Sequence, residues 1–318
     1  AEMGVNPYTI TEGKAFNGAL SGCSITEAEA MFNLALHNQP DLEEVILVCD
    51  LVMINSRNKD KVTTASSRLN PDIPMVPYYF QSFFGYNATL KSIDMLKSFS
   101  RGKKAVRNIQ GHIFRKKSIQ KKSTRSNFDR VLWQYANPKG TYSTFEYDSK
   151  NLSYIRSINT ACKENNIKLV LVSPPIHGEL QHVINACHLW DIFEQYKRDL
   201  LEIVSEAPST TSFWDFSGFS TFTTEVLPEE RWADDVKLKW YIEPAHFTSE
   251  LGDIVLNRIY GKAGNSDFGL RLTTENIEAH LLEVRKGLEQ WHRDHPAENE
   301  RLQRIMAGEY PQEVRLVH

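Results

Sequence analysis

Residues 44–51 read EVILVCDL, a run rich in β-branched side chains with a single carboxylate, Asp50, near its end. Because apolar and polar residues do not alternate, this run predicts a strand that is buried on both faces of a sheet. Residues 168–173 (KLVLVS), which two prolines follow, have the same character, and residues 211–216 (TSFWDF) are expected to form the next strand. A weaker strand is expected over residues 14–20 (KAFNGAL).

Helical patterns separate these strands. Ser24 and Glu27 form a predicted capping box for a helix that ends before Pro40. Further helices are expected over residues 152–165 and, as one long element, over about residues 178–205. The alternation of strands and helices predicts an α/β fold, a three-layer α/β/α sandwich with a parallel sheet.

The end of the chain predicts a C-terminal helical arm. Thr273 is the expected N-cap of an amphipathic helix, and a shorter helix is expected over about residues 297–306. We therefore expect an α/β domain over residues 1–265 and a helical extension over residues 266–318. The extension either packs on the domain or meets a partner.

Composition is that of an ordinary globular protein: 318 residues, 41% hydrophobic and 24% charged, with a net charge of −3. The chain as a whole is not basic, which disfavours nucleic acid as a partner. It contains no signal sequence and no apolar run of the roughly 20 residues that a membrane span needs. The four cysteines lack CxxC or metal-ligand spacing and do not decide the redox compartment. No metal site and no cofactor are expected.

A basic insertion covers about residues 98–130, and Asp129 is its only acid. Such a run is either a solvated segment or a flap that attracts an anionic polymer or membrane headgroups. We expect the stretch between Arg101 and Arg130 to be exposed and partly mobile. Aromatic residues that could stack on bases are nearly absent, which again argues against nucleic acid.

Glu243 and His246 are the candidate catalytic residues. They flank Pro244 and Ala245, and the proline favours a turn that folds the carboxylate back onto the imidazole. Thr248 or Ser249 then caps an amphipathic helix. A carboxylate beside an imidazole suits general base catalysis, although the same pair occurs more often as a surface or structural contact.

Other candidates follow the predicted strands, where loops at the carboxyl ends of parallel strands meet at one rim. A capping role already explains Ser24 better than a nucleophilic one. Asp50 ends a buried strand and needs a partner or an open cleft. His177 either lines that cleft or begins a helix. The full set of expected cleft and oxyanion residues is Gly22, Ser24, Asp50, Asn55 and His177.

The order of segments FNGALSGCSITEA, EVILVCDL, LVLVSPPIHGEL, FWDFSGFSTFTTE and YIEPAHFTSELGDIVLNRI resembles a branch of bacterial SGNH (GDSL-like) hydrolase-fold envelope proteins. The resemblance spans nearly the whole chain and implies a flavodoxin-like sandwich. It implies that Glu243 and His246 are the acid and base of a triad. It also implies that the backbone N–H of Gly22 helps to hold the oxyanion. The oxyanion asparagine is poorly matched, because Asp50 ends the strand and the nearest asparagine is Asn55.

The nucleophile departs from the family pattern. The resemblance implies a G-[ST]-S-R type turn directly before a segment similar to residues 1–7, so the serine is expected upstream of Ala1, with a membrane anchor further upstream. Otherwise the protein lacks the nucleophile. The implied function is a serine esterase or O-acyltransferase that acts on an acylated glycan of the bacterial cell envelope, on its periplasmic side. The alternative is a non-catalytic scaffold or binding protein.

Overall fold

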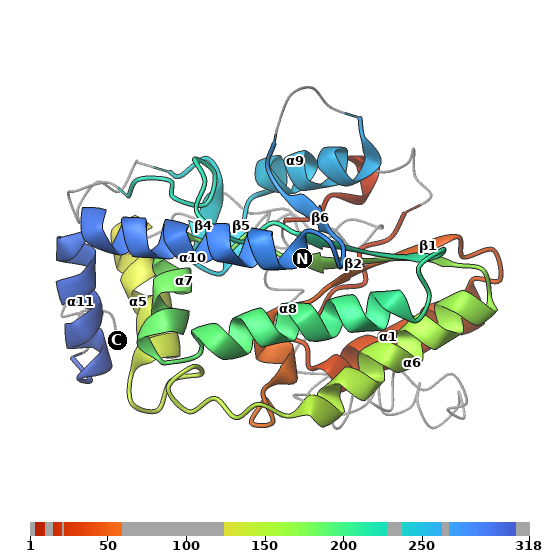
Figure 1. Ribbon diagram of the computed structural model, residues 1–318, viewed down its shortest axis with the longest axis horizontal. Coiled ribbons are helices and arrows are strands. Elements are labelled where there is room, and N and C mark those ends of the chain that lie inside the picture. The colour runs from red at the N-terminus through yellow and green to blue at the C-terminus, as the bar shows by residue number, and fades with distance from the viewer. Residues whose placement is uncertain are drawn as a thin grey trace, which may run out of the picture.

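The computed structural model describes residues 4–9, 15–20, 22–58, 124–227, 237–262 and 267–309. Its centre is a four-stranded sheet of order β1-β2-β3-β6 (Figure 1). Strands β1 (Glu44–Val48), β2 (Lys168–Ser173) and β3 (Thr211–Asp215) are parallel, as the sequence predicts. Strand β6 (Leu270–Leu272) is antiparallel to β3 and was not predicted. The protein is therefore a mixed α/β protein with a mainly parallel sheet.

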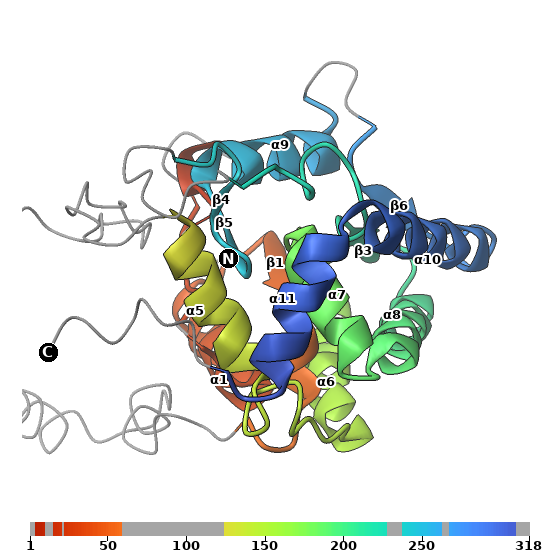
Figure 2. The same ribbon diagram turned by 90° about the vertical axis from the view of Figure 1, so that its left-hand side faces the viewer.

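Alternate residues of the three parallel strands enter two different hydrophobic clusters, one on each face of the sheet. In β2, Leu169 and Leu171 enter the larger cluster, whereas Val170 and Val172 enter the smaller one. Helices cover both faces (Figure 2). The larger cluster contains side chains of α1 (Ile25–Asn38), α6 (Leu152–Glu164) and α8 (Trp190–Ser205), and the smaller one those of α9 (Ser249–Tyr260).

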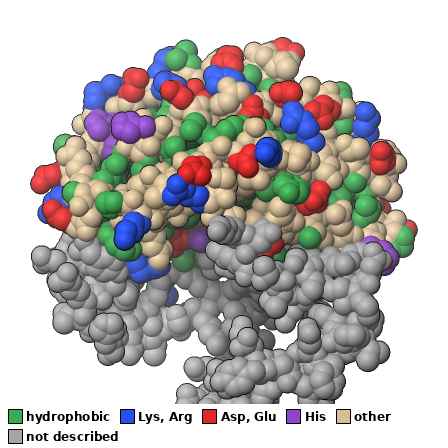
Figure 3. Space-filling model, turned by 90° about the horizontal axis from the view of Figure 1, so that it is seen from below, with side chains coloured by type: hydrophobic (Ala, Val, Ile, Leu, Met, Phe, Trp, Pro, Cys, Tyr) green, Lys and Arg blue, Asp and Glu red, His purple; other side chains and the backbone are tan. Residues whose placement is uncertain are grey.

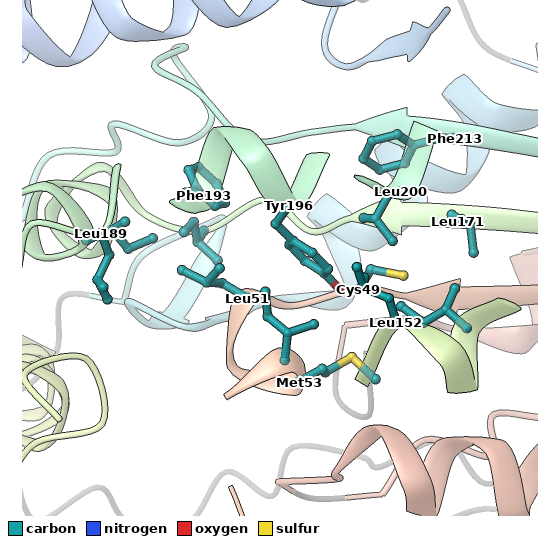
Figure 4. Packing of buried hydrophobic residues seen from close by; sticks show 14 of the residues in the cluster. Cys49, Leu51, Met53, Leu152, Leu171, Leu189, Phe193, Tyr196, Leu200 and Phe213 are labelled. Carbon is teal, nitrogen blue, oxygen red and sulfur yellow. The ribbon is translucent and has the colours of Figure 1, made fainter. Parts of the chain in front are cut away.

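Strand β1 lies at one edge of the described sheet, and all five of its residues are only half-buried. The prediction of burial on both faces is therefore too strong for this strand. The next residues are better buried, because Cys49 and the short 3-10 helix η2 (Leu51–Ile54) enter the larger cluster. Tyr196 of α8 points toward Cys49 in Figure 4. This packing fixes the backbone on both sides of Asp50.

The strand expected over residues 14–20 does not form in the part that the structure describes, residues 15–20. In this segment the side chain of Asn17 forms hydrogen bonds with backbone groups. Its Nδ2 donates to the carbonyl of Val5 at 2.8 Å, and its Oδ1 accepts the N–H of Ala19 at 3.1 Å. Such local side-chain bonds offer the backbone an alternative to a strand ladder.

The long helix predicted over residues 178–205 is two helices, α7 (Gly178–Ala186) and α8. His188 adopts a left-handed conformation with φ of 60°. The N–H of Leu189 then bonds back to the carbonyl of Ile184 at 3.0 Å, which is the bond that ends a helix in a Schellman motif. No glycine or proline marks this break, so sequence pattern alone missed it.

The C-terminal segment is part of the α/β fold. Helix α10 (Ile277–Asp294) begins after Asn276, whose Oδ1 accepts the N–H of Thr273 at 2.8 Å, so Thr273 is not the N-cap that we expected. Strand β6 pairs with β3 inside the predicted extension. Buried residues of α10 and of α11 (Pro296–Met306) join the larger cluster. A boundary at residue 265 therefore cuts the sheet from one of its strands.

Residues 98–123 of the basic insertion lie outside the described residues. The end of the insertion forms the first part of α5 (Thr124–Ala136), which packs against α7 and α11. Phe128 is completely buried, and Asp129 is buried as well. The prediction of an exposed segment is therefore wrong for residues 124–130.

A buried ion cluster joins α11 to this region. The guanidinium of Arg301 contacts Asp129 of α5 and lies 2.6 Å from Oε2 of Glu179 in α7. Arg125 lies 3.7 Å from the same glutamate. Burial alone would raise the pKa of Glu179, but the cations Arg301 and Arg125 hold this pKa below its usual value.

A second buried cluster joins α8 and α10 to the end of β3. Asp215 accepts hydrogen bonds from Lys197 at 2.8 Å and from His280 at 2.9 Å. Burial opposes the charge of Asp215, yet Lys197 and His280 keep the pKa of this carboxyl well below its usual range.

The outer surface carries charges of both signs. Figure 3 shows basic and acidic side chains interspersed on one face. No helix in the described ranges is long and apolar enough to cross a bilayer.

Stability should fall as pH is lowered from 6.5 toward 4, because His182 of α7 is buried with no hydrogen bond to Nδ1. Burial, together with the neighbouring His292, lowers the pKa of His182 to about 4. Between these pH values the unfolded chain binds a proton that the folded chain does not. We expect a loss on the order of 2–3 kcal/mol in the free energy of unfolding.

Urea titrations at several pH values measure this loss. The His182→Leu protein removes the group and should show a flatter dependence on pH in the same window. An unchanged pH dependence in that variant would contradict the assignment.

Candidate active site

Glu243 and His246 face each other across a small hairpin. Strand β4 (Tyr241–Glu243) and strand β5 (His246–Phe247) are antiparallel, and Glu243 pairs with His246 in their register. Pro244 and Ala245 form the turn between them, as predicted. The sequence spacing therefore places the carboxylate and the imidazole side by side.

The contacts of this pair define the protonation of the imidazole. One carboxylate oxygen of Glu243 bonds to Nδ1 of His246, and the other accepts the N–H of Ala245 at 3.0 Å. A carboxylate can only accept, so Nδ1 carries the proton and Nε2 of the neutral ring is free to accept one. The side chain of Glu243 is 8% exposed and that of His246 is 45% exposed. A buried acid thus orients a solvent-accessible base.

The hairpin is tied to the start of α9. Thr248 is the N-cap, and its hydroxyl oxygen accepts the N–H of Leu251 at 3.5 Å. The same hydroxyl donates to the carbonyl of Lys239 at 2.8 Å, and the N–H of Thr248 donates to the carbonyl of Trp240 at 2.9 Å. These bonds confirm Thr248 as the predicted cap. They also hold His246 two residues before a helix N-terminus.

Asp50 lies at the same rim. Its Oδ1 accepts the N–H of Val52 at 3.1 Å, which begins η2. Burial raises the pKa of Asp50, the negative charge of Glu243 raises it further, and His246 opposes this effect. The carboxyl group therefore lies within electrostatic range of both members of the pair.

The other expected cleft residues are occupied in other ways. Ser24 forms the predicted capping box with Glu27. Asn55 accepts two backbone N–H groups and donates to the carbonyl of Thr141 at 3.3 Å, which anchors the segment before α6. Neither side chain bonds to the Glu243–His246 pair within the described residues. Gly22 is exposed, with a left-handed φ of 62°.

His177 follows β2, and its backbone N–H donates to the carbonyl of Pro244 at 3.0 Å. The loop after β2 therefore contacts the hairpin, as the rule for parallel strands predicts. The imidazole of His177 is only 3% exposed, so it lies beneath the hairpin and does not line an open surface.

Sequence reasoning missed Tyr135 of α5. Burial raises the pKa of its hydroxyl, and the nearby carboxylates of Asp50 and Glu243 raise it further. Helix α5 reaches the site because Asn127 donates from Nδ2 to the carbonyl of Ile242 at 3.3 Å. No local sequence motif predicts that this tyrosine lies at the site, because its position depends on how α5 packs against β4.

The N-terminal segment runs along the hairpin and α9. Gly4 packs on the ring of Phe247, and a Cβ atom on Gly252 would lie 1.5 Å from the carbonyl oxygen of Gly4. The hydroxyl of Thr9 donates to Asp253 at 2.5 Å. Residues 4–9 therefore lie beside the strand that carries His246.

Replacing Gly252 by alanine should destabilise the protein by about 1–3 kcal/mol, because the new methyl group would overlap the backbone of Gly4. Helix propensity alone would make the Gly252→Ala protein about 1 kcal/mol more stable than the wild type. The sign of the change in the free energy of unfolding, measured with urea, therefore decides whether residue 4 packs here. A more stable Gly252→Ala protein would show that it does not.

No protein-family model, no curated protein and no solved structure matches this chain. The described residues contain no group of three or more His, Cys, Asp or Glu side chains placed to hold a metal ion.

Proposed function

We propose that the protein is an SGNH-type serine esterase or O-acyltransferase that acts on an acylated cell-envelope polysaccharide or a similar acyl ester. The observation that carries this proposal is the Glu243–His246 pair, in which a buried carboxylate fixes an exposed imidazole with Nε2 free to take a proton. A base oriented in this way is what acyl transfer to or from a serine requires.

In the proposed reaction a serine hydroxyl attacks the ester carbonyl while His246 takes its proton at Nε2. The tetrahedral intermediate carries an oxyanion, which the backbone N–H of Gly22 helps to hold. The intermediate collapses, and His246 returns the proton to the departing alcohol. Water or a sugar hydroxyl then attacks the acyl-enzyme, with His246 again as the base, and releases the serine. Glu243 stabilises the imidazolium in both halves.

We propose that the nucleophilic serine precedes Ala1. Two observations support this position. Residues 4–9 run beside β5, so a serine a few residues upstream is within reach of His246. The outer edge of β1 pairs with no strand of the described residues, and a parallel strand there would end beside Asp50. A location in the bacterial envelope, with an anchor further upstream and a basic surface for anionic polymer, belongs to the same proposal.

The second candidate function is a non-catalytic scaffold. One observation favours it: within the described residues, no serine hydroxyl forms a hydrogen bond with His246. In that case the sandwich and the basic insertion would serve only to bind an envelope component.

A fluorophosphonate probe, which labels activated serines covalently, distinguishes the two functions. It should be applied to a chain that includes the natural residues before Ala1, with the chain that begins at Ala1 as the control. The proposal requires labelling of the longer chain alone, on a serine that peptide mass spectrometry places upstream of Ala1. An unlabelled, folded longer chain would favour the scaffold.

A further inference from the structure

A buried three-way junction lies directly beneath the Glu243–His246 hairpin, and His177 is its centre. The Nδ1 atom of His177 accepts the N–H of Glu179 at 3.2 Å and so caps α7. Its Nε2 atom bonds to the carbonyl of Glu225 at 2.9 Å. Its backbone N–H bonds to the carbonyl of Pro244. One residue therefore joins the start of α7, the segment after β3 and the turn of the hairpin.

These contacts leave the ring a single protonation state. A backbone N–H can only donate and a carbonyl can only accept, so Nδ1 is unprotonated and Nε2 carries the proton. Burial lowers the pKa of His177, and this effect outweighs the nearby carboxylates of Glu179 and Glu225. A second proton on Nδ1 would break the cap of α7.

The junction holds strand β4 along its whole length. Just before the strand, the carboxylate of Glu225 accepts the N–H groups of Lys239 at 2.6 Å and Trp240 at 2.8 Å. At its middle, the ring of Tyr241 meets the ring of His177 edge to face, with centroids 5.1 Å apart. At its end, the turn bonds to the backbone of His177. These contacts reach the segment that carries Glu243 at the end of β4.

We propose that His177 is a positioning residue that sets the geometry of the Glu243–His246 pair. It acts through the hairpin and does not touch the reacting atoms. The positioning of the pair by His177 does not require that the protein be an enzyme. The effect of His177 on turnover rests on the proposed function.

The test compares His177→Asn with wild type. Asparagine is a good N-cap, so it keeps the acceptor for α7, but it is too short to reach Glu225 and lacks the ring that supports Tyr241. Asn159→Ala is the matched control, because Asn159 is equally buried and bonds to Ile203 and Thr211 at the opposite end of β3. Long-range ¹H–¹⁵N spectra of the histidine rings report the tautomer of His246 directly.

We expect His246 in wild type and in Asn159→Ala to hold its proton on Nδ1, and His177→Asn to lose this preference. In the longer chain that carries the serine, His177→Asn should lower kcat about tenfold or more with KM nearly unchanged. An unchanged tautomer of His246 in folded His177→Asn would overturn the proposal. If the tautomer changes but no chain shows activity, the proposed function fails and the positioning role stands.

A measurement on the wild-type protein covers the case in which His177→Asn does not fold. The ring of His177 should show a proton on Nε2 and titrate below pH 6.5, the ordinary pKa of histidine. A His177 ring that titrates near pH 6.5, or that carries its proton on Nδ1, would overturn the proposal.

Discussion

The His246→Ala protein, made in a chain that carries the residues before Ala1, is expected to lose nearly all esterase or transacylase activity. Loss of the general base in serine hydrolases costs on the order of 10⁶-fold in kcat. The midpoint of thermal unfolding should hardly change, because the imidazole is about half exposed and packs little against the core. Hydrolysis of an activated acetyl ester measures the first effect and calorimetry the second.

The Glu243→Gln protein should lose less activity, on the order of 10⁴-fold. Glutamine keeps the volume and the acceptor for the N–H of Ala245, but its amide cannot stabilise an imidazolium and favours the wrong tautomer of His246. Glu250→Gln, at an exposed carboxylate in the first turn of α9, is the matched control and should retain full activity. Full activity in His246→Ala would end the catalytic role of the pair.

The Arg301→Met protein is expected to lose about 3–5 kcal/mol in the free energy of unfolding. Methionine fills much of the same space, but it removes the shared cation from two buried carboxylates, Asp129 and Glu179. Because these two residues lie in α5 and α7, the loss should loosen α11 from both helices. Urea titration at neutral pH gives the magnitude.

Two controls separate a buried from an exposed ion pair. Arg156 pairs with Glu202 and Glu206 on the surface, so Arg156→Met should cost less than about 1 kcal/mol. The cost of Arg301→Met should also shrink as pH falls below 4.5, the ordinary pKa of glutamate, because a neutral Glu179 no longer needs a counter-charge. Equal costs for the two arginines would contradict a buried role for Arg301.

Strands β1, β2 and β3 were predicted correctly from the sequence. Strands β1 and β2 are apolar runs, whereas β3 (TSFWD) has only two apolar residues, Phe213 and Trp214. The parallel pairing of all three follows from the alternation with helices. Strand β6 is only Leu270–Leu272 with an arginine at its centre, so its place depends on contact with β3 and leaves little trace in the sequence. The break between α7 and α8 at His188 also leaves little trace in the sequence, because no glycine or proline marks it.

The site divides in the same way. Glu243 and His246 are three residues apart, and a proline turn joins them, so local geometry was enough to bring them together. Tyr135 reaches the site through the packing of α5, and His177 is placed beneath it by contacts with segments far along the chain. Contacts of this kind depend on tertiary structure, which periodicity and capping signals do not encode.

The antiparallel pairing of β6 with β3 has a consequence for the order of events during synthesis. A ribosome releases β3 well before β6, because the hairpin and α9 lie between them. Helices α5 and α7, which support the hairpin, likewise lack the counter-charge of Arg301 until α11 has been synthesised. The nascent chain can form its three parallel strands early. The edge of β3 that pairs with β6, and the helices that support the hairpin, stay incomplete until the last segments emerge. A translational pause before β6 would lengthen the time during which this edge is exposed to other chains.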